Sequence, residues 1–484
     1  MDGPRDRPNV LWICTDQQRW DTLGCYGNDH VDTPHLDRLA AGGVLFERAF
    51  CQSPVCTPSR ASFLTGRYPR TTRCRQNGQS IPADERLISR LLADAGYACG
   101  LSGKLHLSPC HISAAPVIER RIDDGYAEFH WSHHPDQDWP TNEYGVWLRA
   151  RGERYARTPF RGSDHVEAGM PAELHQTTWC AQKAIEFIDA HADAATPWLF
   201  SVNIFDPHHP FDPPPELLER YLDRLEAIPL PNYVPGELDD KPAFQRIDHR
   251  GAYGGNAGFA YDKMDDADHR LVRAAYWAMC DLIDQQVGRM LEALDRTGQR
   301  EDTIVIFMSD HGEMLGDHGI YLKGPYFYEP AVRVPLIVSW PGAIPGGRRV
   351  TEMVELADLA PTLLDAAGLD RFPGMQGASL WPLLRDADAD APPRADVYSE
   401  YYNAMPWHRD PTAQATMIRT DRHKLVAVHS LGTGELYDLE ADATETRNLW
   451  DDPDHREIKN ALLTRLCDRM AWTVDPLGPR VAPY

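Results

Sequence analysis

The sequence predicts an α/β protein with a mostly parallel sheet, followed by a smaller α+β subdomain with an antiparallel sheet. Short apolar runs rich in β-branched and aromatic residues alternate with amphipathic helical patterns along most of the chain. Several of these runs end in polar or charged residues, and near the C-terminal end strand-like segments follow one another without intervening helices. Because open α/β sheets bind ligands outside the carboxyl ends of their strands, we expect the functional site there.

The apolar runs predict the strands, and the helical patterns between them predict helices on both faces of the sheet. Helices are expected at 35–43 and 274–294. Two other stretches show neither the pattern of a strand nor that of a helix. They are 110–175, rich in Trp, His and Asp, and 206–270, rich in Pro and charged residues. We expect both to be long functional loops over the ligand-binding edge. The expected strands are 9–16, 97–103, 198–206, 303–310 and 335–340.

A run of Asp, Ala and Pro at 386–393 predicts a linker between two units. It separates an expected catalytic domain, 1–385, from a C-terminal subdomain, 394–484, since a chain of 484 residues exceeds the size of a single growing core. Within the subdomain we expect short antiparallel strands and a helix near 454–470. The final segment, DPLGPRVAPY, leaves open both a homo-oligomer contact and a surface extension.

Composition narrows the class of partner. The chain has 72 acidic and 49 basic residues, a net charge of −23, which argues against nucleic acid or an anionic membrane as a general partner. No apolar stretch approaches the roughly 18 residues of a membrane span. The start, MDGPRDRPNV, lacks the apolar stretch of a secretory signal, and ten cysteines include no C-x-x-C pair. We therefore expect a cytoplasmic enzyme with reduced thiols.

The segment CTPSRASFLTGRYP (56–69) contains a Cys-x-Pro-x-Arg core followed by Leu-Thr-Gly-Arg. Pro58 suits the first turn of a helix, so Cys56 is expected at a helix N-terminus, where free N–H groups favour an anion. Arg60 adds a permanent positive charge. The alternative interpretation is a buried cysteine that only packs.

Polar pairs follow two of the predicted strands. Asp16 and Gln17 end the first strand, and Asp310 and His311 end the strand at 303–310. Carboxylates that end separate strands are natural ligands of a divalent cation. An isolated Asp at such a place is more often a turn or helix cap, so only the combination with the Cys segment favours a metal site.

Together these segments resemble the formylglycine-dependent sulfatases, or type I sulfatases, of the alkaline phosphatase superfamily. TDQQRWDTLGCYGN (15–28) and MSDHGEMLGDHG (308–319) are similar to the family's two metal segments, in the family's order around the Cys motif. The resemblance implies an alkaline-phosphatase-like α/β/α sandwich and conversion of Cys56 to formylglycine (3-oxoalanine) by a formylglycine-generating enzyme. It also implies one divalent metal ion, held by Asp16, Gln17, residue 56, Asp310 and His311.

The metal segments depart from the commonest family pattern. Many sulfatases have Asp-Asp and Asp-Asn where this chain has Asp-Gln and Asp-His. The departure looks more like the branch of choline sulfatases and phosphonate monoester hydrolases. An oxygen-rich site favours Ca²⁺ and a His ligand favours Mn²⁺, and we expect Ca²⁺ by a small margin. The neighbouring Asp317 and His318 suggest a second metal, but a loop-stabilising role is the better expectation.

Two further segments extend the resemblance to the sulfate-binding groups. GKLHL (103–107) resembles the family's Gly-Lys-x-His element, which implies that Lys104 binds sulfate and that His106 is the base for sulfate release. Lys323, thirteen residues after Asp310, occupies the position of the family's second sulfate-binding lysine.

The leaving-group side is implied by DPHHPF (206–211), which resembles the family's His-x-Pro-Phe. On this resemblance His208, rather than His209, lies near the leaving-group oxygen. Asn77, in RQNGQS, is a candidate substrate contact, although an Asn-Gly dipeptide more often forms a turn.

The leading hypothesis is a sulfuric-ester hydrolase of arylsulfatase-like type. As the resemblance implies, one hydroxyl of the hydrated formylglycine attacks sulfur, and the other later expels sulfate. The metal ion stabilises the developing charge together with Arg60, Lys104 and Lys323. His208, helped by Lys323, protonates the departing alcohol. The substrate is a small-molecule or saccharide sulfate ester, with aryl, choline and sugar sulfates all open.

Two alternatives remain. A phosphonate monoester or phosphodiester hydrolase would use the same nucleophile, but the pair of Lys104 and His106 resembles sulfatases more than that branch. A non-catalytic protein that binds sulfated glycans would not need a nucleophile, a base and metal ligands together.

Overall fold

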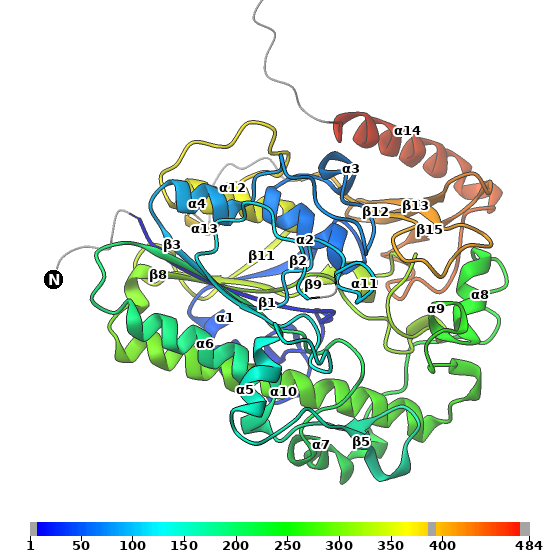
Figure 1. Cartoon of the computed structure of the whole chain (residues 1–484). Coiled ribbons are helices and arrows are strands. Elements are labelled where there is room, and N and C mark those ends of the chain that lie inside the picture. The colour runs from blue at the N-terminus through cyan, green and yellow to red at the C-terminus, as the bar shows by residue number, and fades with distance from the viewer. Residues whose placement is uncertain (1–6, 116, 386–393, 475–484) are drawn as a thin grey trace, which may run out of the picture.

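The computed structural model describes residues 7–115, 117–385 and 394–474 (Figure 1). The expected linker at 386–393 and the tail at 475–484 lie outside the described residues. The division into domains at that linker therefore remains a prediction.

The core of the molecule is a mixed, mostly parallel sheet with the strand order β11-β2-β10-β8-β1-β7-β3-β4 and with β9 paired to β2. All five predicted strands are confirmed. β10 is antiparallel to both β8 and β2, whereas β8, β1, β7, β3 and β4 run parallel to one another. The strands are β1 Asn9–Thr15, β2 Val44–Phe50, β3 Ala98–Gly103, β4 Glu128–Trp131, β7 Trp198–Asn203, β8 Thr303–Ser309, β9 Arg333–Val334, β10 Leu336–Ser339 and β11 Arg348–Glu355.

Helices cover both faces of this sheet, as predicted (Figure 1). On one face α1 (Pro34–Ala41), α6 (Gln176–Ala190) and α10 (Asp266–Arg296) pack on Leu11 and Ile13 of β1. Helices α2, α4 and α12 pack on the opposite face, which β1 presents through alternate residues. These helices are α2 Cys56–Thr65, α4 Ile88–Asp94 and α12 Leu359–Ala366.

The two stretches expected to be long loops contain short regular elements instead. Residues 110–175 include β4, which extends the sheet beyond β3, and residues 206–270 include several short helices. The prediction was wrong here because elements of four to eight residues show too little of their period to be recognised. The remaining short helices are α3 Pro69–Thr72, α5 Glu143–Arg149, α7 Pro215–Leu222, α8 Ala243–His249, α9 Ala252–Gly255, α11 Glu329–Val332 and α13 Trp381–Arg385. A two-stranded ribbon joins β5 Thr158–Pro159 to β6 Glu167–Ala168.

The C-terminal part is a four-stranded antiparallel sheet with one long helix, as predicted. Helix α14 (Arg456–Trp472) packs on one face of this sheet through Leu462 and Leu466. The strands are β12 Val397–Tyr402, β13 Gln414–Arg419, β14 His423–Val428 and β15 Thr433–Asp438. In the described part of the chain, no helix combines the length and the apolar character that a membrane span requires.

Candidate active site

The carboxyl ends of β1 and β8 bring two acidic side chains together. β1 and β8 are parallel neighbours with Thr15 opposite Ser309, so the next residue of each strand, Asp16 and Asp310, lies at the same edge. The backbone N–H of Gln17 donates to Asp310 Oδ1 at 3.0 Å, and both aspartates are fully buried. Their proximity follows directly from strand register.

Cys56 is the first residue of α2 and points at this edge. Its Sγ lies 3.2 Å from His311 Nε2 and 3.6 Å from Asp16 Oδ1. Asp16, Cys56, Asp310 and His311 are all buried and present ligand atoms within 4.8 Å of one another. Two carboxylates and an imidazole beside residue 56 fit a divalent cation, because these oxygen and nitrogen donors suit such ions.

Arg60 binds the carboxylates of both Asp16 and Asp310. Its guanidinium donates from Nε to Asp310 Oδ2 at 2.9 Å, from Nη2 to Asp16 Oδ2 at 3.1 Å and from Nη1 to the Lys104 carbonyl at 2.8 Å. The side chain is 1% exposed. With all three groups engaged, Arg60 orients the two aspartates.

Lys104 follows β3 and reaches the same centre. Its Nζ lies 2.5 Å from Asp16 Oδ2 and 3.7 Å from Cys56 Sγ. Burial alone would raise the pKa of Asp16, but the charges of Lys104, Arg60 and Lys323 hold this pKa well below its ordinary value. Asp16 is therefore a carboxylate at any ordinary pH.

The thiol of Cys56 is distinguished from other buried thiols by its electrostatic surroundings. Burial and Asp16 raise its pKa, yet Lys104, Lys323 and His311 outweigh them and the net shift is downward. In contrast, burial raises the pKa of Cys51 well above its ordinary value. The position of residue 56 thus favours a negatively charged or strongly polar group.

Lys323 connects His208 to Gln17 beside the aspartates. Its Nζ lies 2.6 Å from His208 Nε2 and 2.6 Å from Gln17 Oε1. Burial and the charge of Lys323 hold the pKa of His208 well below its ordinary value, so the imidazole is neutral near pH 7. The tautomer with hydrogen on Nδ1 satisfies both contacts of this ring, since Nδ1 faces the His209 carbonyl at 2.5 Å.

Gln17 and Asn77 have partners other than those expected from sequence. The Gln17 side-chain amide joins Lys323 to the buried carboxylate of Glu313. Asn77 Oδ1 accepts the backbone N–H of Thr57 at 3.0 Å and so satisfies the N-terminus of α2. Asn77 acts in the structure as a capping residue within a turn, while the roles of Gln17 as a ligand and of Asn77 as a substrate contact remain predictions.

Several residues of the site were not identified from the sequence. Glu313 accepts hydrogen bonds from the backbone N–H of Leu315, at 2.9 Å, and from the Gln17 amide. It lies inside the second metal segment, and this position in the sequence could have identified it as a residue of the site. Tyr253 is buried in a left-handed backbone conformation, with its ring 5.6 Å from that of His209. No sequence pattern marks Tyr253, because contacts between distant segments bring it here.

His106 lies beyond Lys104 with its ring 4.4 Å from that of His133. The expected loop-stabilising role of Asp317 and His318 agrees with their contacts: Asp317 pairs with Arg19 at 2.7 Å, and His318 Nδ1 lies 3.1 Å from a Glu237 oxygen. Among the described residues, neither belongs to a group of potential metal ligands.

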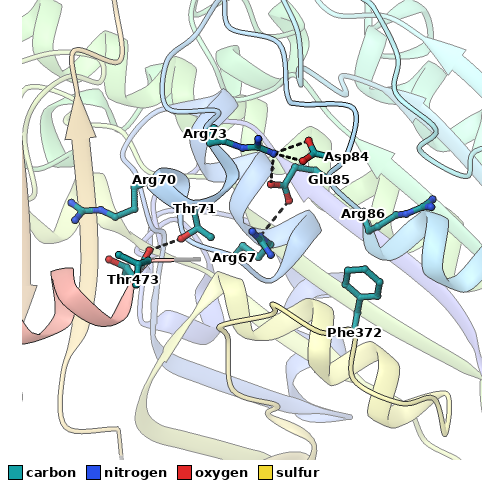
Figure 2. Close-up of a pocket in the computed structure, with 10 residues that line it drawn as sticks. Arg67, Arg70, Thr71, Arg73, Asp84, Glu85, Arg86, Phe372 and Thr473 are labelled. Carbon is teal, nitrogen blue, oxygen red and sulfur yellow. Dashed lines mark hydrogen bonds and ion pairs between the residues drawn. The ribbon is translucent and has the colours of Figure 1, made fainter. Parts of the chain in front are cut away.

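A separate surface pocket of 460 Å³ is lined by arginines but is chemically different from this centre. Figure 2 shows Arg73 bound to Asp84 and Glu85, with Arg67 also directed at Glu85. Arg70 pairs with Glu400 at 2.7 Å. Because these cations already have acidic partners, the pocket is not a ready anion site.

Comparisons with known proteins agree with the site geometry. The profile of the sulfatase family matches residues 8–369, and the C-terminal profile of N-sulphoglucosamine sulphohydrolase matches residues 316–471. The chain is 30% identical to a choline-sulfatase of Rhizobium meliloti, covering 98% of this chain and 89% of the relative. It is 29% identical to an arylsulfatase of Clostridium perfringens, covering 93% and 92%.

The solved structures confirm the predicted fold class. A phosphonate monoester hydrolase from Silicibacter pomeroyi superposes with a TM-score of 0.84 at 27% identity, covering 97% of this chain and 96% of that one. A second such hydrolase, from Agrobacterium radiobacter, gives a TM-score of 0.83 at 27% identity, covering 97% and 96%. The chain therefore belongs to the sulfatase family, as a hydrolase of the type I, alkaline-phosphatase-like branch.

Proposed function

We propose that this sulfatase hydrolyses a sulfate monoester at the centre around Cys56, with residue 56 converted to formylglycine and one divalent metal ion beside it. The observation that carries the proposal is the convergence of Asp16, Lys104 and His311 on Cys56 Sγ, at 3.6, 3.7 and 3.2 Å. The Cys56 sulfur stands where the oxygens of hydrated formylglycine would lie. The names of the arylsulfatase and choline-sulfatase relatives support sulfate as the group transferred.

The bound groups supply the chemistry that the side chains lack. Formylglycine supplies a hydroxyl nucleophile at position 56, and the metal ion supplies a Lewis acid for the sulfate oxygens. Asp16, Asp310 and His311 are the proposed ligands, with Gln17 beside them. Ca²⁺ remains slightly favoured over Mn²⁺, and elemental analysis of the purified enzyme would decide between them.

The basic residues divide into two proposed roles. Arg60 positions the carboxylates of Asp16 and Asp310, because its three donating groups are engaged there and with the Lys104 carbonyl. Lys104 and Lys323 are the proposed contacts to the sulfate oxygens, since each has a flexible ammonium directed at the centre. We thus assign Arg60 as a positioning residue.

Proton transfer is proposed to use two histidines, His208 beside Lys323 and His106 beyond Lys104. His208 and Lys323 share a contact of 2.6 Å, so the Lys323 ammonium can pass a proton to the departing alcohol directly or through the imidazole. His106 is neutral near pH 7, because burial and the neighbouring His133 and Lys104 lower its pKa. A neutral imidazole can accept the proton when sulfate is released.

Phosphonate monoesters are the second candidate substrates, favoured by the likeness to two phosphonate monoester hydrolases. The pair of Lys104 and His106 favours sulfate. Comparing kcat/KM for a nitrophenyl sulfate and a nitrophenyl phenylphosphonate, with enzyme produced beside a formylglycine-generating enzyme, separates the two. We expect a higher kcat/KM for the sulfate than for the phosphonate. In Lys104→Ala, kcat/KM should fall more for the sulfate than for the phosphonate. A preference of more than about tenfold for the phosphonate, about 1.4 kcal/mol in transition-state binding, would reverse the assignment.

A further inference from the structure

We propose that His106, Cys110 and His133 form a second metal site, which takes Zn²⁺ or another thiophilic divalent cation and inhibits the enzyme when occupied. The imidazole nitrogens and Cys110 Sγ lie within 4.8 Å of one another. The His106 side chain is more than nine-tenths buried, and its ring is 4.4 Å from the His133 ring at an angle of 66°. Two imidazoles and a thiol are the donor set that zinc prefers.

The sheet explains why these side chains meet. β3 and β4 are parallel neighbours with Gly103 opposite Trp131. His106 and His133 each follow the end of one of these strands within three residues, so they leave the sheet at the same edge. The intervening loop returns Cys110 to the same place.

The donor atoms are available for a ligand. Among the residues that the structure describes, the buried Nδ1 atoms of His106 and His133 have no hydrogen-bond partner. Cys110 Sγ makes two weak contacts, at 3.3 Å to the Ser108 carbonyl and at 3.5 Å to Glu119 Oε2. Buried polar nitrogens without partners are costly, and coordination to a cation would satisfy them.

One acidic side chain, Glu119, lies beside the three donors. Burial and the neighbouring Lys104 and Arg60 lower the pKa values of both histidines, so a bound cation would need the Glu119 carboxylate to offset that positive charge. Glu119 is 1% exposed and accepts from the His106 backbone N–H at 3.2 Å, Trp131 Nε1 at 2.9 Å and the Cys110 thiol. Within the described ranges, no basic side chain forms an ion pair with it. Burial raises the pKa values of both Glu119 and Cys110. A divalent ion with one thiolate and one carboxylate beside it would make a neutral buried cluster.

Binding requires a modest local movement. Tetrahedral zinc has bonds of about 2.0–2.3 Å, which place its donors roughly 3.3–3.8 Å apart, so the distances between donors would shorten by no more than about 1.5 Å. As the sulfur–metal bond forms, the Cys110 thiol releases its proton to solvent. Glu119 would then be the fourth ligand or a hydrogen-bonding support.

Inhibition follows from the position of His106 and rests on the function proposed above. A metal-bound imidazole cannot accept the proton of sulfate release. The centre at Asp16 and Asp310 presents mainly oxygen donors, whereas the cluster at Cys110 presents nitrogen and sulfur. A hard ion such as Ca²⁺ would therefore prefer the centre at Asp16 and Asp310, and a softer ion such as Zn²⁺ would prefer the cluster at Cys110.

Metal binding can be tested without any activity. In a Cys56→Ala background, which removes the thiol of the first centre, Co²⁺ alone should give a thiolate-to-cobalt charge-transfer band whose final intensity corresponds to one thiolate-bound Co²⁺ per chain and which disappears on adding Zn²⁺. Adding Cys110→Ser should abolish the band, and His133→Gln should weaken Co²⁺ binding. Adding Cys467→Ser, at an exposed cysteine, is the matched control and should keep the band. A missing band in the parent, or one that survives Cys110→Ser, would overturn the site.

Inhibition is tested separately on active enzyme saturated with Ca²⁺. Zn²⁺ should lower sulfate-ester turnover relative to each variant's own zinc-free rate. The inhibition constant should rise at least about tenfold in Cys110→Ser, since even the loss of a supporting residue weakens metal sites to that extent. An unchanged inhibition constant would refute the regulatory role. Sulfatase inactivity of the zinc-free enzyme would instead count against the proposed function and leave the cobalt result standing.

Discussion

At the scale of single residues, the centre is defined by buried charges that satisfy one another. Asp16 contacts both Arg60 and Lys104, and Asp310 contacts Arg60 a second time. An isolated buried charge costs several kcal/mol, so each of these residues is needed for the burial of the others. Lys104 also lowers the pKa of Cys56, together with Lys323 and His311. The electrostatic arrangement is thus present in the protein before substrate binds.

The pairing of His208 with Lys323 predicts a dependence on the leaving group. His208→Ala should lower kcat by about 10²–10⁴-fold for an alkyl sulfate, whose alcohol needs a proton to depart, and much less for a nitrophenyl sulfate. His209→Ala is the matched control, because its ring stacks on that of His208 at 4.1 Å, whereas the Lys323 ammonium contacts His208. Equal losses on both esters in His208→Ala would show that this histidine does not serve leaving-group departure.

Sequence motifs identified the residues whose positions follow from local structure. Asp16 and Asp310 could be predicted because they follow recognisable strands, and Cys56 could be predicted because Pro58 indicated a helix N-terminus. The partners of Gln17 and the full engagement of Arg60 depend on side chains brought from distant segments. These contacts could not be predicted without the tertiary structure.

At the scale of elements, α1 shows how a neighbouring helix supplies a missing cap. Thr33, its N-terminal flanking residue, makes no side-chain capping bond. Instead Asp284 of α10 accepts the backbone N–H groups of Leu36 at 2.7 Å and His35 at 3.2 Å. Burial raises the pKa of Asp284 to about 7. The capping carboxyl thus joins two helices on one face of the sheet.

This raised pKa predicts a pH-dependent contribution to stability. Between about pH 4 and 7 the Asp284 carboxyl holds its proton in the folded state and loses it in the unfolded state. The contribution of Asp284 to the free energy of unfolding is therefore fully present below that pH window and is lost as the pH rises through it. Asp284→Asn cannot titrate, so the Tm of the wild type should fall relative to that of the variant as the pH rises across the window.

The exposed Asp421→Asn is the control for this experiment and should leave the difference in Tm constant. The Asn substitution also loses one acceptor for a backbone N–H, which shifts Tm equally at every pH. The slope is therefore the informative quantity. Parallel curves for Asp284→Asn and wild type would refute the assignment.

The predicted strands of the central sheet are those that are buried along all or nearly all of their length. β1, β7 and β8 are buried at every residue, and inside these strands only Ser201 of β7 interrupts the apolar run. β2 was not predicted because Glu47 and Arg48 interrupt its pattern at the middle, where the strand is only half-buried. β4 was missed because it has four residues at the edge of the sheet. Short or partly exposed strands carry too little hydrophobic signal.

At the scale of the whole molecule, the C-terminal sheet is fixed to the catalytic part by buried ion pairs. Lys424 of β14 is fully buried, with Nζ 3.0 Å from Glu329, 2.6 Å from Glu445 and 2.8 Å from the Phe327 carbonyl. Glu329 belongs to α11, shortly after Lys323 of the active site. Burial acts to raise the pKa of Glu329, but Lys424 and Arg419 bring it down to about 2. The two parts therefore share one buried charge network.

This network predicts that the protein unfolds in one transition. Lys424→Met leaves two buried carboxylates without their shared cation and should destabilise the protein by about 3–5 kcal/mol. The Tm should fall, and calorimetry and tryptophan fluorescence should both still show a single transition in which the two sheets unfold together. Lys183→Met, which removes an exposed pair with Glu186 at 2.9 Å, is the control and should cost less than about 1 kcal/mol. Two separate transitions, of which only one shifts, would mean that the C-terminal sheet folds independently.

The measurement that tests the central claim most directly is hydrolysis of a nitrophenyl sulfate by the wild type and by Cys56→Ala. Both are expressed with a formylglycine-generating enzyme and supplied with Ca²⁺ or Mn²⁺, and mass analysis of the peptide around residue 56 verifies the conversion. We predict turnover by the wild type and its loss in the variant, with an unchanged circular dichroism spectrum. Equal turnover by both proteins, or none by fully converted wild type, would contradict a sulfatase that acts through residue 56.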